Sequence, residues 1–180
     1  MSETISLAPV PQLDGLTLRR IQWLHPALRN EATMIYARIA TALAGRAVCR
    51  FSSTLRTAEE QEALYARGRT LPGPKVTNAR GGHSYHNYGL AIDIVLLVDT
   101  QEAGLYETPS WETSLRFDDA HRSHWQPIVS AFKAYGWEWG GAGSLAGMPH
   151  FQKILGYSIA RLQQLQAAGA FLPGGSYLAL

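Results

Sequence analysis

Residues 89–97 form an apolar run that is typical of a β-strand, in which side chains with a period of two share a face. Large aliphatic residues occupy one predicted face of this strand: Leu90, Ile92, Ile94 and Leu96. The other face carries three apolar residues and one acid: Ala91, Asp93, Val95 and Leu97. A buried carboxylate without a partner is costly, so we expect a cation or several hydrogen-bond donors to meet Asp93.

Helical spacing of apolar residues and helix-capping patterns predict four helices. Pro26 suits the first turn of one helix, Thr57 and Glu60 form a capping-box pattern at the start of another, and Ser158 is an expected N-cap. The expected helices cover about residues 26–43, 57–68, 127–136 and 158–169. Short strands are expected near 47–51, 137–139 and 150–152, with irregular segments at 68–82, 99–123 and 142–148.

These elements predict one α+β domain over residues 1–180, with helices packed on a small, mainly antiparallel sheet. The length suits a single domain, and 46% hydrophobic residues is enough for a compact core. We expect an extended segment up to about residue 18. Cys49 lies in an apolar strand pattern and is interpreted as a small buried hydrophobic residue.

Three side chains are candidate metal ligands: His86, Asp93 and His150. His86 precedes Asp93 by seven residues across a glycine, and a proline stands directly before His150 in a second strand pattern. Two histidines and one carboxylate, with water in a fourth position, form the ligand set of a catalytic zinc site. Without His150, the other two residues are equally compatible with a loop histidine and an edge-strand carboxylate in water.

The pattern Ser-x-His-x-x-Gly-x-x-x-Asp at residues 84–93, followed by Pro-His-Phe at 149–151, resembles the zinc peptidases of the D-Ala-D-Ala carboxypeptidase and L-alanyl-D-glutamate endopeptidase family. Further matching segments follow in the same order along nearly the whole chain: Leu24-His25-Pro26, Leu55-Arg56-Thr57, Glu60-Gln61, Ala63-Leu64-Tyr65, Gly68-Arg69-Thr70, Val76-Thr77-Asn78-Ala79 and residues 136–141. They favour the endopeptidase branch, which includes several phage endolysins. The resemblance implies the α+β fold of the Hedgehog and D-Ala-D-Ala peptidase domains.

The resemblance also implies roles for individual residues. Zn²⁺ held by the three candidate ligands would polarise the scissile carbonyl group and lower the pKa of its bound water towards about 7. Arg56 corresponds to an arginine that binds the carbonyl oxygen as it becomes negatively charged, although an ordinary surface salt bridge is an alternative for it. Ser84 is expected to orient a ligand or to contact the substrate, and Gln61 to contact the substrate.

One position departs from the family pattern. Family members carry Asp or Glu three residues before the last histidine as the general base, whereas this chain has Gly147. Three explanations stay open: Glu138 substitutes, Asp118 or Asp119 reaches the site, or the chain is a homologue that binds zinc and peptidoglycan with little turnover. The Asp/His cluster that contains these two aspartates is interpreted as a solvated loop.

Charge and hydropathy limit the partners. Sixteen basic and 14 acidic residues give a net charge of +2, which argues against a dedicated nucleic-acid binder. Residues 1–16 lack the positively charged start and apolar core of a signal peptide, and no stretch approaches membrane-spanning length. We expect a monomer made in the cytoplasm, without stable membrane association, that reaches the cell wall after release or through another export system.

The sequence therefore predicts a zinc-dependent peptidoglycan peptidase that cleaves the stem peptide at the L-Ala-D-Glu bond, in cell-wall lysis or remodelling. The alternatives are a catalytically impaired, peptidoglycan-binding homologue and a D-Ala-D-Ala carboxypeptidase. The carboxypeptidase would need a closed pocket with a cation for the free carboxylate of its substrate, and Arg69 or Lys75 could supply that cation.

Overall fold

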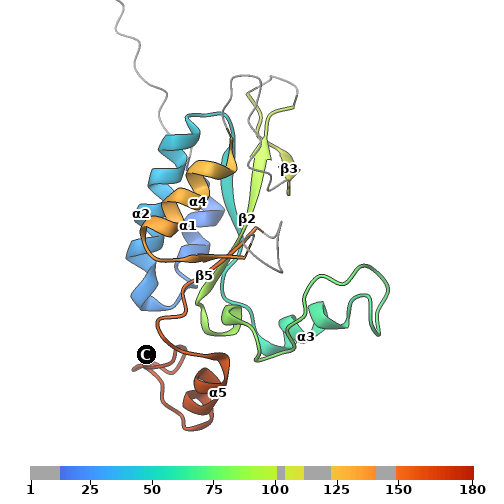
Figure 1. Ribbon diagram of the computed structural model, residues 1–180, viewed down its shortest axis with the longest axis vertical. Helices are drawn as coiled ribbons and strands as arrows, with labels where there is room; N and C mark the ends of the chain where they lie inside the picture. The colour runs from blue at the N-terminus through green and yellow to red at the C-terminus, as the bar shows by residue number, and fades with distance from the viewer. Residues whose placement is uncertain (1–12, 101–103, 112–122, 141–148) are drawn as a thin grey trace, which may run out of the picture.

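The computed structural model describes residues 13–100, 104–111, 123–140 and 149–180. In these parts the chain forms five α-helices, one short 3₁₀ helix and a five-stranded sheet. Helices α1, α2 and α4 lie together on one side of the sheet, α3 lies on the other side, and α5 lies near the C-terminus (Figure 1). The predicted α+β class with a small antiparallel sheet is confirmed.

The sheet carries a row of polar residues that belongs to the candidate site. Its strand order is β1-β2-β5-β4, β3 also pairs with β2, and every pairing is antiparallel. The strands are β1 Val48–Ser53, β2 Ala91–Val98, β3 Thr108–Ser110, β4 Glu138–Trp139 and β5 His150–Gln152. Ser53 pairs with Asp93, and Asp93 pairs with His150. Because neighbouring strands lie about 4.8 Å apart, these three side chains are within reach of one another.

Four of the five described helices, α2 to α5, begin and end close to where the sequence patterns place them. The helices are α1 Gly15–Ile21, α2 Pro26–Leu43, α3 Ala58–Ala66, α4 Trp125–Ala134 and α5 Ile159–Ala167. The capping box of Thr57 and Glu60 is present at the start of α3, and Ser158 caps α5. Local capping patterns therefore predicted these two helix starts correctly.

The core lies between the sheet and the helices beside it. The aliphatic residues predicted to share one strand face are at most 2% exposed: Leu90, Ile92, Ile94 and Leu96. Phe132 of α4 stacks on Phe151 of β5 with ring centroids 4.1 Å apart, and Cys49 is buried as expected. Each fully buried aliphatic side chain contributes roughly 1.5–3 kcal/mol, so this layer supports the strands that carry Asp93 and His150.

Two segments differ from the prediction. The stretch expected to be extended to about residue 18 contains α1, whose N-cap Asp14 also forms an ion pair with Arg50 of β1 at 2.9 Å. That partner lies 36 residues away, so the contact leaves no local sequence pattern. The stretch 99–123, expected to be irregular, contains β3, whose pairing with β2 is likewise a tertiary contact.

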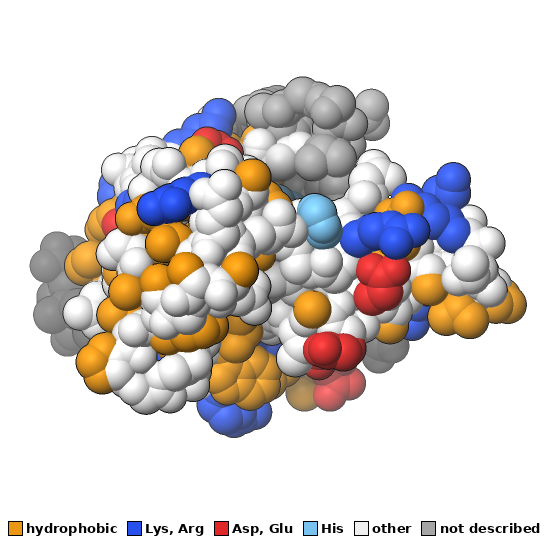
Figure 2. All heavy atoms as spheres, turned by 90° about the horizontal axis from the view of Figure 1, so that it is seen from below, with side chains coloured by type: hydrophobic (Ala, Val, Ile, Leu, Met, Phe, Trp, Pro, Cys, Tyr) orange, Lys and Arg blue, Asp and Glu red, His pale blue; other side chains and the backbone are white. Residues whose placement is uncertain are grey.

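Helix α3 and the loop that follows it stand apart from the main body, at the right of Figure 1. Seen from below, this part carries both basic and acidic side chains, and a histidine reaches the surface between it and the main body (Figure 2). The expected irregular segment 68–82 contains no helix or strand element. None of the described helices is long and apolar enough to cross a membrane.

Candidate metal centre

His86 is positioned by a short 3₁₀ helix, η1, at Tyr85–Tyr88. The Ser84 hydroxyl caps this helix by accepting a hydrogen bond from the backbone N–H of His86 at 3.3 Å. Gly89 ends it with a φ of +68°, and a Cβ at this position would lie 2.7 Å from the backbone nitrogen of His25. The Ser-x-His-x-x-Gly pattern therefore places a helix cap, a candidate ligand and a residue free to take positive φ.

A backbone carbonyl fixes the ring of His86 at the nitrogen that points away from the other two candidate ligands. Its Nδ1 lies 2.6 Å from the carbonyl oxygen of Thr54. A carbonyl oxygen only accepts hydrogen bonds, so Nδ1 is the donor and Nε2 of the neutral ring carries a lone pair. Because the residue is only 1% exposed, the surrounding protein sets this orientation.

The predicted ligands His86, Asp93 and His150 are brought together. Asp93 Oδ1 lies 2.8 Å from His150 Nδ1 and 3.1 Å from His86 Nε2. The two ring nitrogens are 3.3 Å apart, and the possible ligand atoms of all three residues lie within 4.8 Å of one another. The cluster therefore joins η1, β2 and β5, and the two histidines are 64 positions apart in the sequence.

The chemistry of this donor set fits a metal ion. His150 Nε2 lies 3.2 Å from Oε1 of Gln152, an acceptor, so Nδ1 of the neutral ring carries the lone pair. Two ring lone pairs and a carboxylate oxygen then face one another at 2.8–3.3 Å, which is unfavourable unless a cation lies among them. Ligand atoms about 2.0–2.1 Å from a tetrahedral Zn²⁺ are separated by roughly 3.3 Å, close to these distances.

The surroundings of Asp93 favour its ionised form. When the inner nitrogens of the two rings carry protons, attraction to His86 and hydrogen bonds from His150 and His86 outweigh the effect of burial, which opposes ionisation, and hold the pKa of Asp93 well below its usual range. Burial also acts to lower the pKa of His150, but the hydrogen bond to Asp93 raises that pKa above its ordinary value. Asp93 is therefore a charged ligand at neutral pH.

Arg56 lies beside the cluster and is held by three acceptors. Its Nη2 donates to Asp93 Oδ2 at 3.0 Å and to Ser53 Oγ at 2.9 Å, and its Nη1 donates to Gln61 Oε1 at 2.7 Å. The Arg56 side chain is 14% exposed, so its ion pair with Asp93 is not an open surface salt bridge. Within the described residues these contacts leave Nε–H and one N–H of Nη1 for another acceptor.

Backbone bonds join Arg56 to the metal-binding helix. The Arg56 N–H donates to the carbonyl of His86 at 3.0 Å. The side-chain amide of Asn87 donates to the carbonyls of Arg56 and Thr57 at 2.9 and 3.0 Å. Sequence reasoning missed Asn87, although its place three residues after Ser84 completes a capping box and could have revealed it.

Gln61 lies beneath Arg56, and its expected contact with the substrate stays a prediction. Its side chain is fully buried, at 0% exposure. While its oxygen accepts from Arg56, its nitrogen donates to the carbonyl of Ala79 at 2.8 Å and to Oγ1 of Thr77 at 3.2 Å. Gln61 therefore positions Arg56 and ties α3 to the loop before the metal motif.

Glu138 reaches the cluster through Gln152, which lies opposite it in the β4–β5 pair. Gln152 Nε2 donates to Glu138 Oε2 at 2.8 Å, and Gln152 Oε1 faces His150 Nε2. Glu138 is thus two hydrogen bonds from the His150 ring. Sequence reasoning missed Gln152, although its place two residues after His150 puts both side chains on one strand face.

Three positions connected with the general base lie outside the described residues: Gly147, Asp118 and Asp119. A role for either aspartate therefore stays a prediction. The same holds for the loss of a base at Gly147 and for the expected role of Glu138.

Comparison with known proteins agrees with this arrangement. Residues 77–153, which include all three candidate ligands, match the model of a family described as D-alanyl-D-alanine carboxypeptidase. The class of protein is thus a peptidase, in a family of metallopeptidases, and the His-Asp-His cluster could hold the metal.

A named relative extends the similarity beyond the metal motif. The chain is 36% identical to the peptidoglycan L-alanyl-D-glutamate endopeptidase CwlK of Bacillus subtilis (strain 168) over 132 residues. The match covers 73% of this chain and 74% of the relative. The chain therefore belongs to the D-Ala-D-Ala carboxypeptidase and L-alanyl-D-glutamate endopeptidase family, which confirms the resemblance drawn from the sequence.

Proposed function

We propose that this protein is a zinc-dependent peptidoglycan peptidase that cleaves the stem peptide between L-alanine and D-glutamate. The observation that carries the proposal is the convergence of His86, Asp93 and His150 beside the guanidinium of Arg56. The similarity to an L-alanyl-D-glutamate endopeptidase over nearly three quarters of both chains supports this choice of substrate and bond.

The three ligand residues suit zinc in the proposed site. Two imidazole nitrogens and one carboxylate oxygen are the usual protein ligands of catalytic zinc. When bound, zinc would supply Lewis-acid chemistry, polarising a carbonyl group and making water acidic enough to ionise near neutral pH. Thr54 and Gln152 hold the outer nitrogens of the two rings, which keeps the inner nitrogens available as ligands.

Arg56 is proposed to stabilise the negative charge that develops on the carbonyl oxygen during cleavage. Its guanidinium is already fixed by Ser53, Gln61 and Asp93, so it need not reorganise during the reaction. Guanidinium also stays protonated and donates in a planar fork. Its remaining N–H groups are the donors proposed to meet the substrate oxygen.

Two specific observations favour alternatives. Gly147 stands where the family has a carboxylate, which favours a homologue that binds the wall peptide with little turnover. The matching family model is described as D-alanyl-D-alanine carboxypeptidase, which favours removal of a terminal D-alanine. One experiment on purified peptidoglycan separates all three functions.

The experiment uses the purified protein with its zinc content measured. An endopeptidase would release fragments with a new amino-terminal D-glutamate, a carboxypeptidase would release free D-alanine, and the impaired homologue would bind peptidoglycan without releasing either. His150→Ala should lose both zinc and turnover, because too few ligands remain to hold the ion. The matched control is His83→Ala, which removes an exposed histidine outside the cluster and should change neither. Full zinc retention in His150→Ala would overturn the site.

A further inference from the structure

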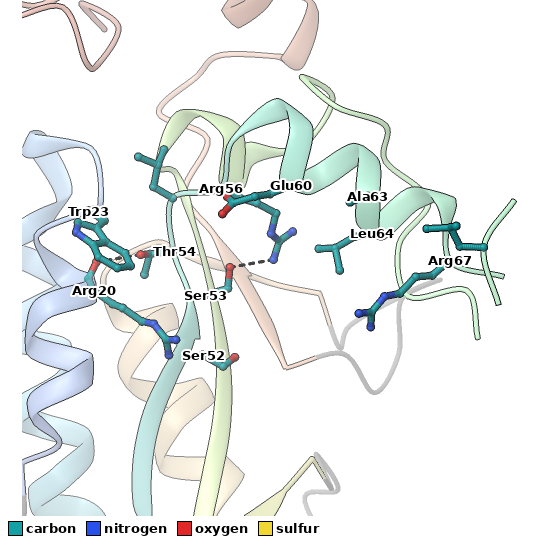
Figure 3. A pocket seen from close by; sticks show the side chains of 12 residues that line it. Arg20, Trp23, Ser52, Ser53, Thr54, Arg56, Glu60, Ala63, Leu64 and Arg67 are labelled. Atoms are coloured by element: carbon teal, nitrogen blue, oxygen red, sulfur yellow. Dashed lines mark hydrogen bonds between the residues drawn. The ribbon is translucent and has the colours of Figure 1, made fainter. Parts of the chain in front are cut away.

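A groove of about 500 Å³ lies beside the candidate metal centre. Its floor is the end of β1 and the residues after it, and its two walls are the end of α1 with Trp23 and the inner side of α3 (Figure 3). This volume lies within the range of roughly 300–1,000 Å³ that is usual for small-ligand sites. The groove can therefore hold a short piece of an extended substrate.

The register of the sheet shows that the groove adjoins the metal centre. Ser53 lines the groove and pairs with Asp93, which pairs in turn with His150. Arg56 belongs to both places, because it lines the groove and donates to Asp93. A peptide held with its scissile carbonyl at Arg56 would therefore extend into the groove on one side of the cut bond.

The groove offers positive charge to such a peptide. Arg67 donates no side-chain hydrogen bond to any described residue, and its side chain extends below α3 towards the groove (Figure 3). Arg20 donates one N–H to the carbonyl of Phe51 at 2.6 Å, and its other N–H donors can bind a ligand. The acid of the groove, Glu60, already accepts the Thr57 N–H in the capping box. Two guanidinium groups are thus available for a ligand.

Apolar surface lies next to these charges. Trp23 and Leu71 both line the groove and are each 52% exposed. Leu64 and Ala63 of α3 line it as well. This mixture suits a chain that carries carboxylates on an aliphatic backbone, and it does not suit a purely apolar ligand.

The chemistry of the proposed cut decides which side of the substrate is acidic. The bond from L-alanine uses the amino group of D-glutamate, so both glutamate carboxyl groups lie on the D-glutamyl side. One of them continues the peptide and the other remains a free carboxylate. The L-alanyl side has no acidic side chain.

We propose that this groove binds the D-glutamyl side of the stem peptide, with Arg67 paired to the free glutamate carboxylate, Arg20 adding positive charge beside it and Trp23 packed against the aliphatic part. The proposal rests on the proposed function, and it adds the direction in which the substrate lies. The L-alanyl side then lies across the metal centre, away from α3. Arg67 is the specificity-determining residue, because its side chain makes no hydrogen bond to any described residue. Arg20, in contrast, also supports β1 through the carbonyl of Phe51.

The test uses two synthetic stem peptides that contain the L-alanyl-D-glutamyl bond, one with the glutamate carboxylate free and one with it amidated. Binding is measured by calorimetry with uncleavable analogues in which a methylene-amine replaces the scissile amide. Turnover of the cleavable forms is measured separately. The variants are Arg67→Gln, Arg67→Glu and the matched control Arg38→Gln, which removes an exposed arginine on α2.

We expect the unmodified protein to bind the free-carboxylate analogue about tenfold or more tightly than the amidated one, as a charge-assisted hydrogen bond would give. Arg67→Gln should abolish this preference and Arg67→Glu should reverse it, with unchanged melting temperatures, while Arg38→Gln should keep it. In turnover, Arg67→Gln should raise KM and leave kcat nearly unchanged.

Two results would overturn the proposal: equal binding of both analogues by the unmodified protein, or an unchanged preference in Arg67→Gln. Failure of the proposed function has a different signature. If the preference depends on Arg67 and neither cleavable peptide is cut, the groove assignment stands and the endopeptidase activity does not.

Discussion

Each histidine of the cluster makes a hydrogen bond from the ring nitrogen opposite its candidate ligand atom. His86 uses a backbone carbonyl for this contact, whereas His150 uses the side chain of Gln152, whose own amide is oriented by Glu138. Side-chain partners of this kind can be removed by substitution, and loss of such a partner typically weakens metal binding about 10- to 100-fold. Glu138 can therefore influence the site through Gln152, apart from any action as a base.

Gln152→Leu should weaken zinc affinity about 10- to 100-fold, because Nε2 of His150 loses its acceptor and the ring can turn or change tautomer. Competition with a chromogenic chelator measures the affinity. Gln166→Leu makes the same change at an exposed position on α5 and should have no effect. Equal affinities in the two variants would show that Gln152 does not position His150.

Arg56→Lys should lower turnover on the order of a hundredfold, because a point ammonium cannot reproduce the planar fork that meets the developing oxyanion. Positive charge beside Asp93 is kept, so zinc content and melting temperature should change little. Steady-state rates on peptidoglycan, with metal analysis and thermal unfolding, check the three quantities. Wild-type turnover in this variant would refute the role of Arg56.

Gly147→Glu or Gly147→Asp should raise hydrolysis of the L-Ala-D-Glu bond, by a factor between about a hundred and ten thousand if only the base is missing. The rate on purified peptidoglycan and the melting temperature are measured together, since glycine can hold backbone angles that other residues cannot. A stable variant with no gain would count against a missing base. If the unmodified protein is already fast, Glu138→Gln tests whether Glu138 supplies the base.

Among the elements, the short 3₁₀ helix η1 both positions the candidate ligand His86 and contacts two other parts of the chain. Ser84 begins this single turn, and Gly89 ends it against the backbone at His25. Asn87 then ties the turn to the loop that carries Arg56. The spacing of Ser84, His86 and Gly89 is therefore set by the geometry of the 3₁₀ turn as well as by the position that His86 must take in the cluster.

Gly89→Ala should destabilise the protein by more than twice the roughly 1 kcal/mol expected from left-handed backbone alone, because the new Cβ would press on the nitrogen of His25. Gly169→Ala is the matched control, with a φ of +67° and open space around it. Denaturant unfolding gives both free energies of unfolding. Equal losses would show that the close approach to His25 carries no cost of its own.

At the scale of the whole molecule, the metal centre joins parts of the chain that are far apart. The rings of His86 and His150 are 64 residues apart, and Arg56 lies 37 residues before Asp93. A ligand that binds only the folded protein stabilises it by mass action. The proposed metal should therefore contribute to the stability of the entire domain.

Removal of zinc with a chelator should lower the melting temperature by about 5–10 °C, if free zinc stood near 100 times its dissociation constant and supplied about 2.7 kcal/mol. Thermal unfolding of the zinc-loaded and chelated protein measures the shift. Added zinc should restore the stability, and His150→Ala should respond to neither treatment. An identical melting temperature with and without zinc would contradict the proposed centre.

Patterns within a few residues were enough to determine several elements. The apolar run around Asp93, with its side chains assigned to two faces, predicted β2 and its buried face, Pro26 marked the start of α2, and Thr57 with Glu60 marked the start of α3. The three candidate ligands were also identified correctly as a group that comes together. Strand period and helix capping are local properties, so they can be read without knowing the rest of the fold.

Tertiary structure alone decided the contacts between distant segments. It buried Gln61 against Arg56, joined Asp14 at the start of α1 to Arg50 of β1, and made the groove between α1 and α3. Such contacts depend on where packing brings elements together, and packing is decided by the shape and burial of the whole core rather than by nearby residues. The sequence by itself thus determined which residues could hold a metal, and the fold decided which side chains hold those residues in place.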